Sequence, residues 1–247
     1  MRTLRLTIAY DGTNYVGWQR QANGISIQQV LEEAFVPLVG TAPTVAGAGR
    51  TDAGVHALAQ VASVNIESAL DAVKVLRALN NRLPFDVRVV DAEDAPLGFH
   101  ARINAKGKHY RYRVETSPVM SPFERWFAWH VPQPLDVAAM REAAASLVGR
   151  HDFSAFQAAG STVATTTRTL ERVDVIESGG DVRNVLIEVE GDGFLRHMVR
   201  TIAGTLVEAG THEREASSVA AILRSKTRHE AGRTAPACGL TLVAVRY

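Results

Sequence analysis

The chain has 247 residues, a length that suits one large or two small domains. Hydrophobic residues make up 46% and charged residues 21%, which excludes a disordered or low-complexity chain, because such chains lack the apolar surface that offsets ordering entropy. With 27 Lys and Arg against 26 Asp and Glu, the net charge of +1 argues against a polybasic, histone-like protein but not against a local basic face.

Alternating apolar residues from Leu4 to Tyr10 predict a half-buried first strand, which Asp11-Gly12 ends. Ser26 and Gln29 form a capping-box pattern that starts a helix, and Gly40 closes this helix. The other elements expected before residue 105 are a strand at 59–66, a helix at 71–83 and a strand at 85–90.

A second round of elements follows. We expect strands at 108–114, 126–131, 170–176, 185–189 and 240–247, and helices at 137–148, 194–206 and 218–224. A turn at Gly179-Gly180 joins two of these strands, and the segments 116–125 and 157–167 are the predicted long loops. Because strands and helices mix without strict alternation, the pattern favours an α+β fold with two sheet-and-helix halves, residues 1–105 and 106–247.

The sequence gives no sign of a membrane segment or a secretory signal. No apolar run approaches the ~18 residues of a membrane span, and the alternating start lacks the continuous apolar core of a signal peptide. Cys238 is the only cysteine, so neither an intrachain disulfide nor a Cys-based zinc site can form. We therefore expect a cytoplasmic protein that has no membrane partner.

The basic residues are mostly arginine, 23 Arg against 4 Lys. Arginine forms bidentate contacts with phosphate and stacks on bases, which lysine cannot do. A GC-rich genome also raises the arginine content, so the excess alone leaves RNA binding and codon usage open.

Residues 45–57 form the densest unusual segment. Gly47 and Gly49 begin a dinucleotide-binding pattern, but Asp52 stands where its third glycine is needed. The chain contains no Gly-Lys-Ser/Thr, His-Glu-x-x-His or Gly-x-Ser-x-Gly sequence. We therefore expect neither a metal nor a nucleotide cofactor.

Arg50 and Asp52 stand among small residues, which let a planar ligand approach the backbone. The residue types alone leave Asp52 equally open as a turn former or as a nucleophile or base. If the segment is extended, Arg50 and Asp52 share one face, and the cation favours the ionised carboxylate.

The segment Gly-Arg-Thr-Asp-Ala-Gly-Val-His-Ala at 49–57 resembles the signature of the bacterial tRNA pseudouridine synthase A family. Four further stretches agree with the family in the same order, at 10–19, 108–112, 191–200 and 235–242. The resemblance runs from about residue 4 to residue 247, essentially the whole chain.

The resemblance implies isomerisation of uridines 38, 39 and 40 in the tRNA anticodon arm. It implies that Asp52 is the catalytic aspartate, that Tyr110 stacks on the uracil and that Arg200 pairs with the aspartate. Leu195 lies in the same motif as Arg200, near the base pocket, and Arg50 corresponds to an arginine that helps to flip the base or fills its place.

The resemblance also implies a fold, partners and cofactors. The family has the pseudouridine synthase fold, two α+β halves joined in a continuous, mostly antiparallel sheet. It acts as a homodimer whose RNA cleft uses both subunits, and it uses no metal and no organic cofactor.

The chemistry needs no cofactor, because breaking N1–C1′ and joining C5 to C1′ oxidises nothing. Asp52 is able to attack C1′ or C6, or to remove the C2′ proton, and the sequence leaves all three open.

Without the resemblance, Tyr110 is more simply an aromatic residue of the core. Arg168 follows the Thr-rich loop, and its position leaves a phosphate contact and a solvated charge at the end of a strand equally open. A regular strand points Arg111 and Arg113 away from Tyr110.

Two other functions stay possible at this point. An RNA-binding module without catalysis explains the arginines and Tyr110 but gives Asp52 no role, since a carboxylate opposes phosphate binding. A metabolic enzyme on an α+β scaffold predicts a compact pocket for a small molecule.

Overall fold

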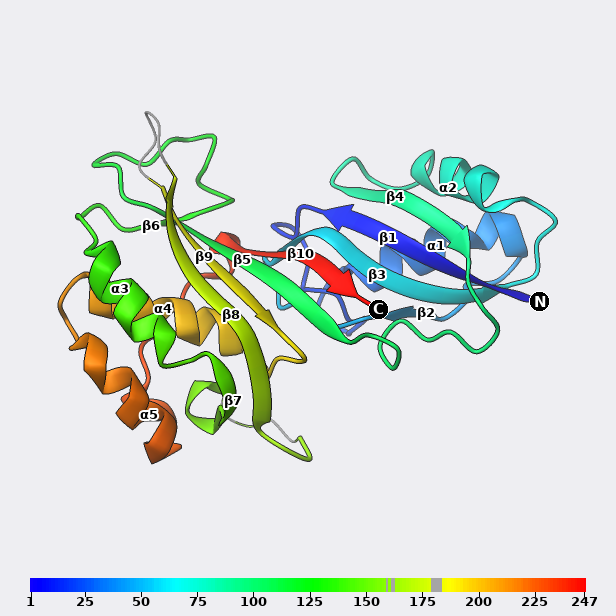
Figure 1. The fold of residues 1–247 in the computed structure, drawn as a ribbon. Coiled ribbons are helices and arrows are strands. Elements are labelled where there is room, and N and C mark those ends of the chain that lie inside the picture. Colours follow the sequence, from blue (N-terminus) through cyan, green and yellow to red (C-terminus); the bar gives the residue numbers. More distant parts are fainter. Residues whose placement is uncertain (159, 161–162, 179–183) are drawn as a thin grey trace. The chain divides into compact units, whose positions relative to one another are not determined.

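The structure is a computed structural model that describes residues 1–158, 160, 163–178 and 184–247. Its helices and strands mix along the chain (Figure 1). The strands are β1 (Arg2–Tyr10), β2 (Val45–Gly47), β3 (His56–Ile66), β4 (Val87–Asp94), β5 (Gly107–Glu115), β6 (Trp129–His130), β7 (Gly149–Asp152), β8 (Thr167–Ser178), β9 (Asn184–Gly191) and β10 (Leu240–Arg246). The helices are α1 (Ile27–Val39), α2 (Ala72–Asn80), α3 (Val137–Ala145), α4 (Met198–Gly210) and α5 (Val219–Ser225).

The fold class is α+β, as the sequence pattern predicts, and the sheet is mostly antiparallel, as the resemblance implies. The described strand pairs within each unit are antiparallel, apart from β10 with β3 and β5 with β6. The predicted turn at Gly179-Gly180 and part of the predicted loop at 157–167 lie outside the described residues.

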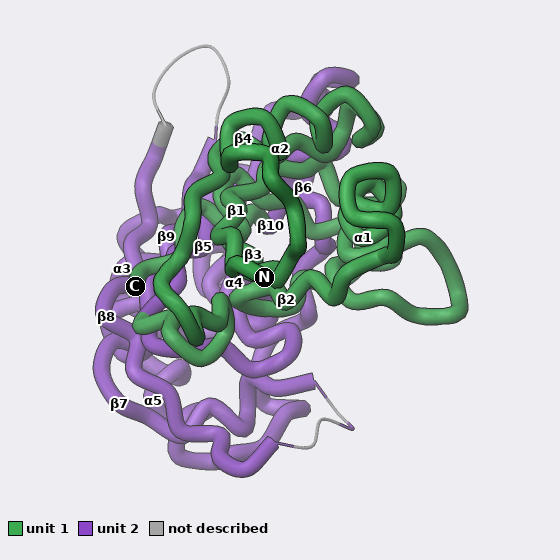
Figure 2. Tube along the Cα trace, turned by 90° about the vertical axis from the view of Figure 1, so that its right-hand side faces the viewer, with its two compact units in different colours: residues 1–106, 241–247 green, residues 107–240 purple. Residues whose placement is uncertain are grey.

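The chain divides into two compact units (Figure 2). Unit 1 consists of residues 1–106 and 241–247, and unit 2 of residues 107–240. The last residues join unit 1, although the sequence pattern assigns them to the C-terminal half. The reason is that β10 pairs in parallel with the start of β3, Thr241 opposite His56 and Leu242 opposite Ala57.

Unit 1 is built on strands in the order β4-β1-β3-β10, with β2 paired to β3. Leu4, Leu6 and Ile8 alternate along β1 and are fully buried, as the alternating pattern predicts. Ser26 caps α1 by accepting a hydrogen bond from the Gln29 N–H at 3.2 Å. The Gln29 side chain donates to Glu33 instead of returning to Ser26, so only half of the capping box forms.

Unit 2 is built on strands in the order β5-β9-β8-β7, with β6 beside β5. Helices α3, α4 and α5 lie on one face of this sheet (Figure 1). The register places Tyr110, Val189 and Val173 in one row across β5, β9 and β8, and all three are buried. The next row begins with Arg111 opposite Glu188, because successive side chains point to opposite faces.

Several boundaries differ from the sequence expectations. The helix expected from residue 194 begins only at Met198, because His197 takes a left-handed conformation with φ of 62° just before it. Of the strand expected at 126–131, only Trp129–His130 forms. The short strands β2 and β7 have too few residues for a periodic pattern and were not expected.

Asp152, at the end of β7, is held by side chains and backbone from three segments. Its carboxylate accepts hydrogen bonds from the Thr166 hydroxyl at 2.6 Å and the Ser154 N–H at 3.1 Å, and it pairs with Lys226 at 3.1 Å. The hydrogen bond from Thr166 and the contacts with Ser154 and Lys226 outweigh burial and lower the pKa of Asp152 from 3.8 to about 2.

The substitution Asp152→Asn is therefore expected to lower the free energy of unfolding by about 1–2 kcal/mol at pH 7. A lowered pKa stabilises the fold above the unfolded-state value of 3.8, and this contribution disappears as the pH falls to about 2. Urea denaturation between pH 7 and pH 2 measures the difference between variant and wild type, with Asp91→Asn at an exposed position as the control. A difference that stays the same over this range would contradict the assignment.

Candidate active site

Asp52 lies in unit 1, in the loop that connects β2 to β3. The segment 50–55 belongs to no strand, so the condition for placing Arg50 and Asp52 on one face of a strand is not met. The position of Asp52 is set instead by the packing of the loop on its neighbours.

The sequence motif at 10–19 forms the support for this loop. The N–H of Trp18 donates to the carbonyl of Thr51 at 3.0 Å. Gly17 has a φ of +101°, and a Cβ atom there would lie 2.5 Å from the Thr51 carbonyl oxygen. Only glycine permits this approach, which explains why glycine stands directly before Trp18 in the motif.

Two contacts flank Asp52. On one side, the Tyr10 and Thr51 hydroxyls are hydrogen-bonded at 2.9 Å in a buried position. On the other side, the N–H of Gly54 donates to the carbonyl of Tyr15 at 3.4 Å. Burial raises the pKa of Tyr10 to about 12, against the effect of its hydrogen bond with Thr51, so this hydroxyl is protonated at neutral pH. The backbone on either side of Asp52 is thereby fixed.

Arg50 is exposed, and its Nε–H donates to the Gln19 side-chain oxygen at 3.1 Å. Gln19 was not expected to take part in the site, although it ends the motif at 10–19. Its amide orients an arginine two residues from Asp52. The structure therefore brings Arg50, Asp52 and Gln19 together on one small part of unit 1.

Tyr110 lies on β5 in unit 2 and is 6% exposed. Its ring meets the ring of Phe194 edge to face, with centroids 5.0 Å apart. On the other face of the strand, Arg111 binds Glu188 at 2.6 Å and Arg113 binds Asn184 at 3.0 Å. Arg111 and Arg113 therefore point away from Tyr110, as the regular strand predicts.

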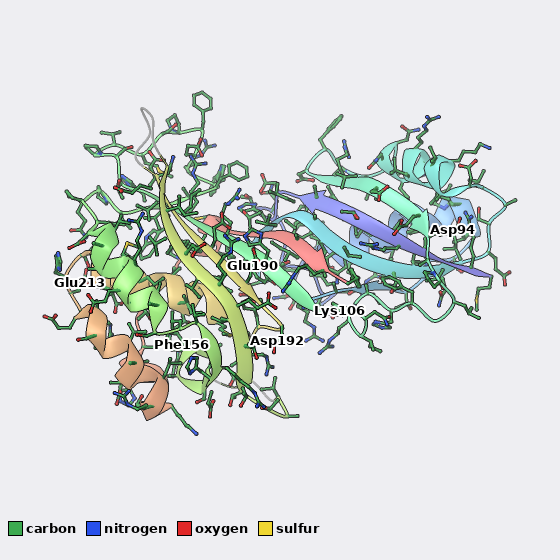
Figure 3. All side chains as sticks on the ribbon, in the orientation of Figure 1. Asp94, Lys106, Phe156, Glu190, Asp192 and Glu213 are labelled. Carbon is green, nitrogen blue, oxygen red and sulfur yellow. The ribbon has the colours of Figure 1, made fainter. Side chains whose placement is uncertain are left out.

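The segment between β9 and α4 carries Leu195, which is 5% exposed. Asp192 anchors this segment to the start of β8 (Figure 3), because its N–H donates to the Thr169 carbonyl and its carboxylate accepts from the Thr169 N–H at 3.0 Å. Arg168 lies beside the same segment, since a Cβ atom on Gly193 would be 3.3 Å from its side chain. Arg168 and the motif at 191–200 are thus neighbours, which their sequence separation did not indicate.

Arg200 lies in the first turn of α4. Its Nε–H donates to the Ala235 carbonyl at 2.8 Å, and the Ala235 N–H donates back to the Arg200 carbonyl at 3.1 Å. Ala235 belongs to the stretch 235–242, to which the sequence assigned no role. The stretch 235–242 agrees with the family in sequence, but only the folded chain shows that Ala235 holds Arg200.

The predicted site residues therefore fall into two sets. Unit 1 holds Arg50 and Asp52, and unit 2 holds the other residues, which are Tyr110, Arg168, Leu195 and Arg200. In unit 2, Tyr110 contacts Phe194, the residue next to Leu195.

Within the described part of the chain, no group of three His, Cys, Asp or Glu residues is placed to hold a metal ion. An open cavity of about 350 Å³ in unit 1 is lined by Pro96, Phe99, Lys106, Tyr247 and their neighbours and includes none of the predicted site residues. Among the described residues, no helix has the length and apolar character that crossing a membrane requires.

The chain is similar to known proteins along its whole length. A family model described as "tRNA pseudouridine synthase" matches residues 6–104 and 143–247. The chain is 46% identical to the tRNA pseudouridine synthase A of Pelobacter propionicus, over 100% of both chains. It is 50% identical to the protein of the same name from Myxococcus xanthus, over 100% of this chain and 92% of the relative, and 47% identical to that of Syntrophotalea carbinolica, over 100% and 97%. The chain belongs to the tRNA pseudouridine synthase family.

Proposed function

We propose that this protein isomerises uridine to pseudouridine at positions 38, 39 and 40 of the tRNA anticodon arm. The observation that carries the proposal is the loop around Asp52. Its nine-residue motif, 49–57, is held on the motif at 10–19 by backbone hydrogen bonds and by close contacts that glycine alone permits. Such a loop holds a carboxylate in one place before substrate arrives, and preorganisation of this kind is what catalysis requires.

The reaction breaks the N1–C1′ bond, rotates the uracil and joins C5 to C1′, while N1 gains a proton and C5 loses one. No electron leaves the substrate. Because the reacting atoms are stacked in the anticodon arm, the nucleotide must first be flipped out, at a cost of a few kcal/mol. Asp52 then acts as the nucleophile at C1′ or C6, or as the base at C2′.

The remaining candidate residues bind the substrate in this proposal. Tyr110 provides an aromatic face for the uracil, and Leu195 provides an apolar wall near it. Arg50 occupies the place of the flipped base, where the Gln19 amide orients its guanidinium. Arg200 is the arginine of the substrate site, and Ala235 fixes the plane of its guanidinium.

We also propose that the protein works as a cytoplasmic homodimer on tRNA. The segment between β5 and β6 exposes Val119 (82%) and Phe123 (86%), apolar side chains that a second subunit would cover in this proposal. Sedimentation velocity at micromolar concentration measures the oligomeric state.

The direct test of the function uses an unmodified tRNA transcript. After incubation with the protein, pseudouridine is mapped by carbodiimide-dependent primer extension, and stops at positions 38 to 40 are expected. Tight binding without any stop would favour the RNA-binding module instead. Neither binding nor modification would favour an enzyme with a small-molecule substrate.

We expect Arg168→Ala to weaken tRNA binding and to reduce the slope of log affinity against log salt by about one, because one phosphate contact is lost. The Arg168 guanidinium donates to the Thr165 and Thr167 carbonyls, so part of it is already held in one direction. The single-turnover rate at saturating tRNA should stay nearly unchanged, because a positioning contact is present in both ground and transition states. An unchanged slope with unchanged affinity would place Arg168 outside the tRNA footprint.

A further inference from the structure

One side of α4 is covered by the segment 231–235. Arg200, Gly204 and Glu208 are spaced four residues apart, so they lie in one row along the helix. At the middle of this row, a Cβ atom on Gly204 would be 1.9 Å from the carbonyl oxygen of Arg233. The segment therefore lies directly on the helix backbone at a position that only glycine permits.

The segment is bound to α4 at three levels. At the first, Arg200 and Ala235 exchange two hydrogen bonds. At the second, the N–H of Gly232 donates to the Thr205 hydroxyl at 2.9 Å. At the third, the N–H of Arg233 donates to Glu208 at 2.9 Å. Arg200 is thus held by a segment whose other attachments are one and two turns further along the helix.

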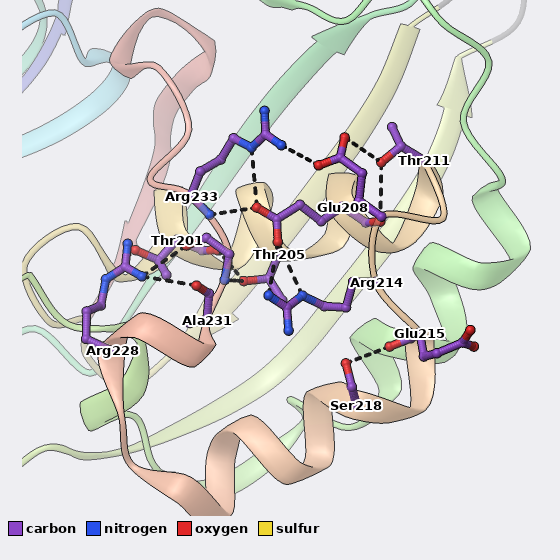
Figure 4. Close-up of polar contacts among 12 residues, drawn as sticks. Thr201, Thr205, Glu208, Thr211, Arg214, Glu215, Ser218, Arg228, Ala231 and Arg233 are labelled. Carbon is purple, nitrogen blue, oxygen red and sulfur yellow. Dashed lines mark hydrogen bonds and ion pairs between the residues drawn. The ribbon is translucent and has the colours of Figure 1, made fainter.

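Glu208 accepts hydrogen bonds on both of its carboxylate oxygens (Figure 4). One of its oxygens accepts from the backbone and the side chain of Arg233, and the other accepts two bonds from Arg214 at 3.1 and 3.2 Å. Its side chain is only 12% exposed. Burial raises the pKa of Glu208, but the bonds from Arg233 and Arg214 together lower it, so the carboxylate is charged at neutral pH.

We infer that Glu208 is a positioning residue for the reaction. It anchors the segment 231–235, and the segment in turn holds the Arg200 guanidinium in the orientation that the substrate needs. Glu208 itself touches no substrate, and its charge serves to fix the segment. The inference rests on the proposed function, because it takes Arg200 to be part of the substrate site.

The test compares Glu208→Gln with Glu213→Gln. The glutamine at 208 has one acceptor oxygen and no charge, so Arg233 and Arg214 compete for that oxygen and the anchor of the segment is weakened. Glu213 is 48% exposed and binds the Arg233 side chain without touching its backbone, so Glu213→Gln removes the same charge without removing the anchor. We expect a ten- to hundredfold lower single-turnover rate for Glu208→Gln, with tRNA affinity within about threefold, and no more than a twofold change for Glu213→Gln.

A double variant separates positioning from a general loss of stability. If Glu208 acts through Arg200, then Arg200→Lys, which lacks the Nε–H, already loses what Glu208 supplies. The rate of the double variant should then equal that of Arg200→Lys alone. If instead the two substitutions lower the single-turnover rate by independent factors that multiply in the double variant, the inference is overturned.

A second measurement does not depend on activity. Hydrogen exchange of the Arg200 Nε–H, assigned by its absence in Arg200→Lys, should speed up at least about tenfold in Glu208→Gln and stay unchanged in Glu213→Gln. Unchanged exchange in a folded Glu208→Gln protein would overturn the inference. If the wild-type protein forms no pseudouridine, the proposed function fails, while the exchange rates still decide whether Glu208 orients Arg200.

If Glu208→Gln does not fold, Thr205→Val takes its place. This change removes the hydroxyl that accepts from Gly232 and keeps the side-chain shape, and Thr205→Ser, which retains the hydroxyl, is its control. Faster exchange and a lower rate in the valine variant but not in the serine variant would support the inference. Equal behaviour of the two would overturn it.

Discussion

Replacing Asp52 with asparagine is expected to abolish pseudouridine formation and to leave tRNA affinity within a few fold. Every mechanism that we consider uses an ionised carboxylate at this position, and asparagine keeps the shape but removes the nucleophile and base. The surrounding backbone is held by contacts of Thr51 and Gly54, so the loop should keep its conformation. Single-turnover product formation and filter binding of tRNA measure the two effects, with Asp91→Asn as the control.

This substitution also tests whether Asp52 only shapes a turn. Asparagine is as well suited to turns as aspartate, so a turn former would tolerate the change. Product formed by Asp52→Asn well above background would therefore remove Asp52 from the chemistry. Unchanged thermal stability together with complete loss of product would leave catalysis as its role.

The second large effect is expected at Tyr110. The substitution Tyr110→Phe keeps the ring and its contact with Phe194, so tRNA affinity should stay within a few fold. Turnover then reports on the hydroxyl. If turnover survives, the hydroxyl is dispensable, and if it collapses while binding is intact, the hydroxyl takes part in a proton transfer such as removal of the C5 proton. The substitution Tyr110→Ala should harm both binding and turnover.

Because Tyr110 is only 6% exposed, an alanine also leaves a cavity, and its effect mixes packing with stacking. Tyr110→Leu separates the two, because leucine fills much of the space without offering a flat aromatic face. If Tyr110 stacks on the uracil, affinity should fall by the equivalent of about 1–3 kcal/mol while the protein stays folded. A leucine variant with wild-type affinity and turnover would show that Tyr110 is a core aromatic alone.

Much of the fold follows from local patterns. The alternation from Leu4 to Ile8 predicts β1, because successive side chains of a strand face opposite sides and only one side is buried. Ser26 and Gly40 predict the ends of α1, because a hydroxyl satisfies the first N–H groups and glycine accepts the φ of 85° that ends the helix. The motif around Asp52 is likewise local, since its identity depends on nine consecutive residues.

The sequence by itself thus determined the α+β class, the main helices and strands and the candidates Asp52, Tyr110 and Arg200. Only the tertiary structure decided that β10 pairs with β3, that Gln19 orients Arg50, and that Ala235 and Glu208 hold the surroundings of Arg200. The physical reason is the range of the interactions. Periodicity and capping act between residues a few positions apart, whereas these pairings join residues from 25 to 185 positions apart and depend on how the whole chain packs.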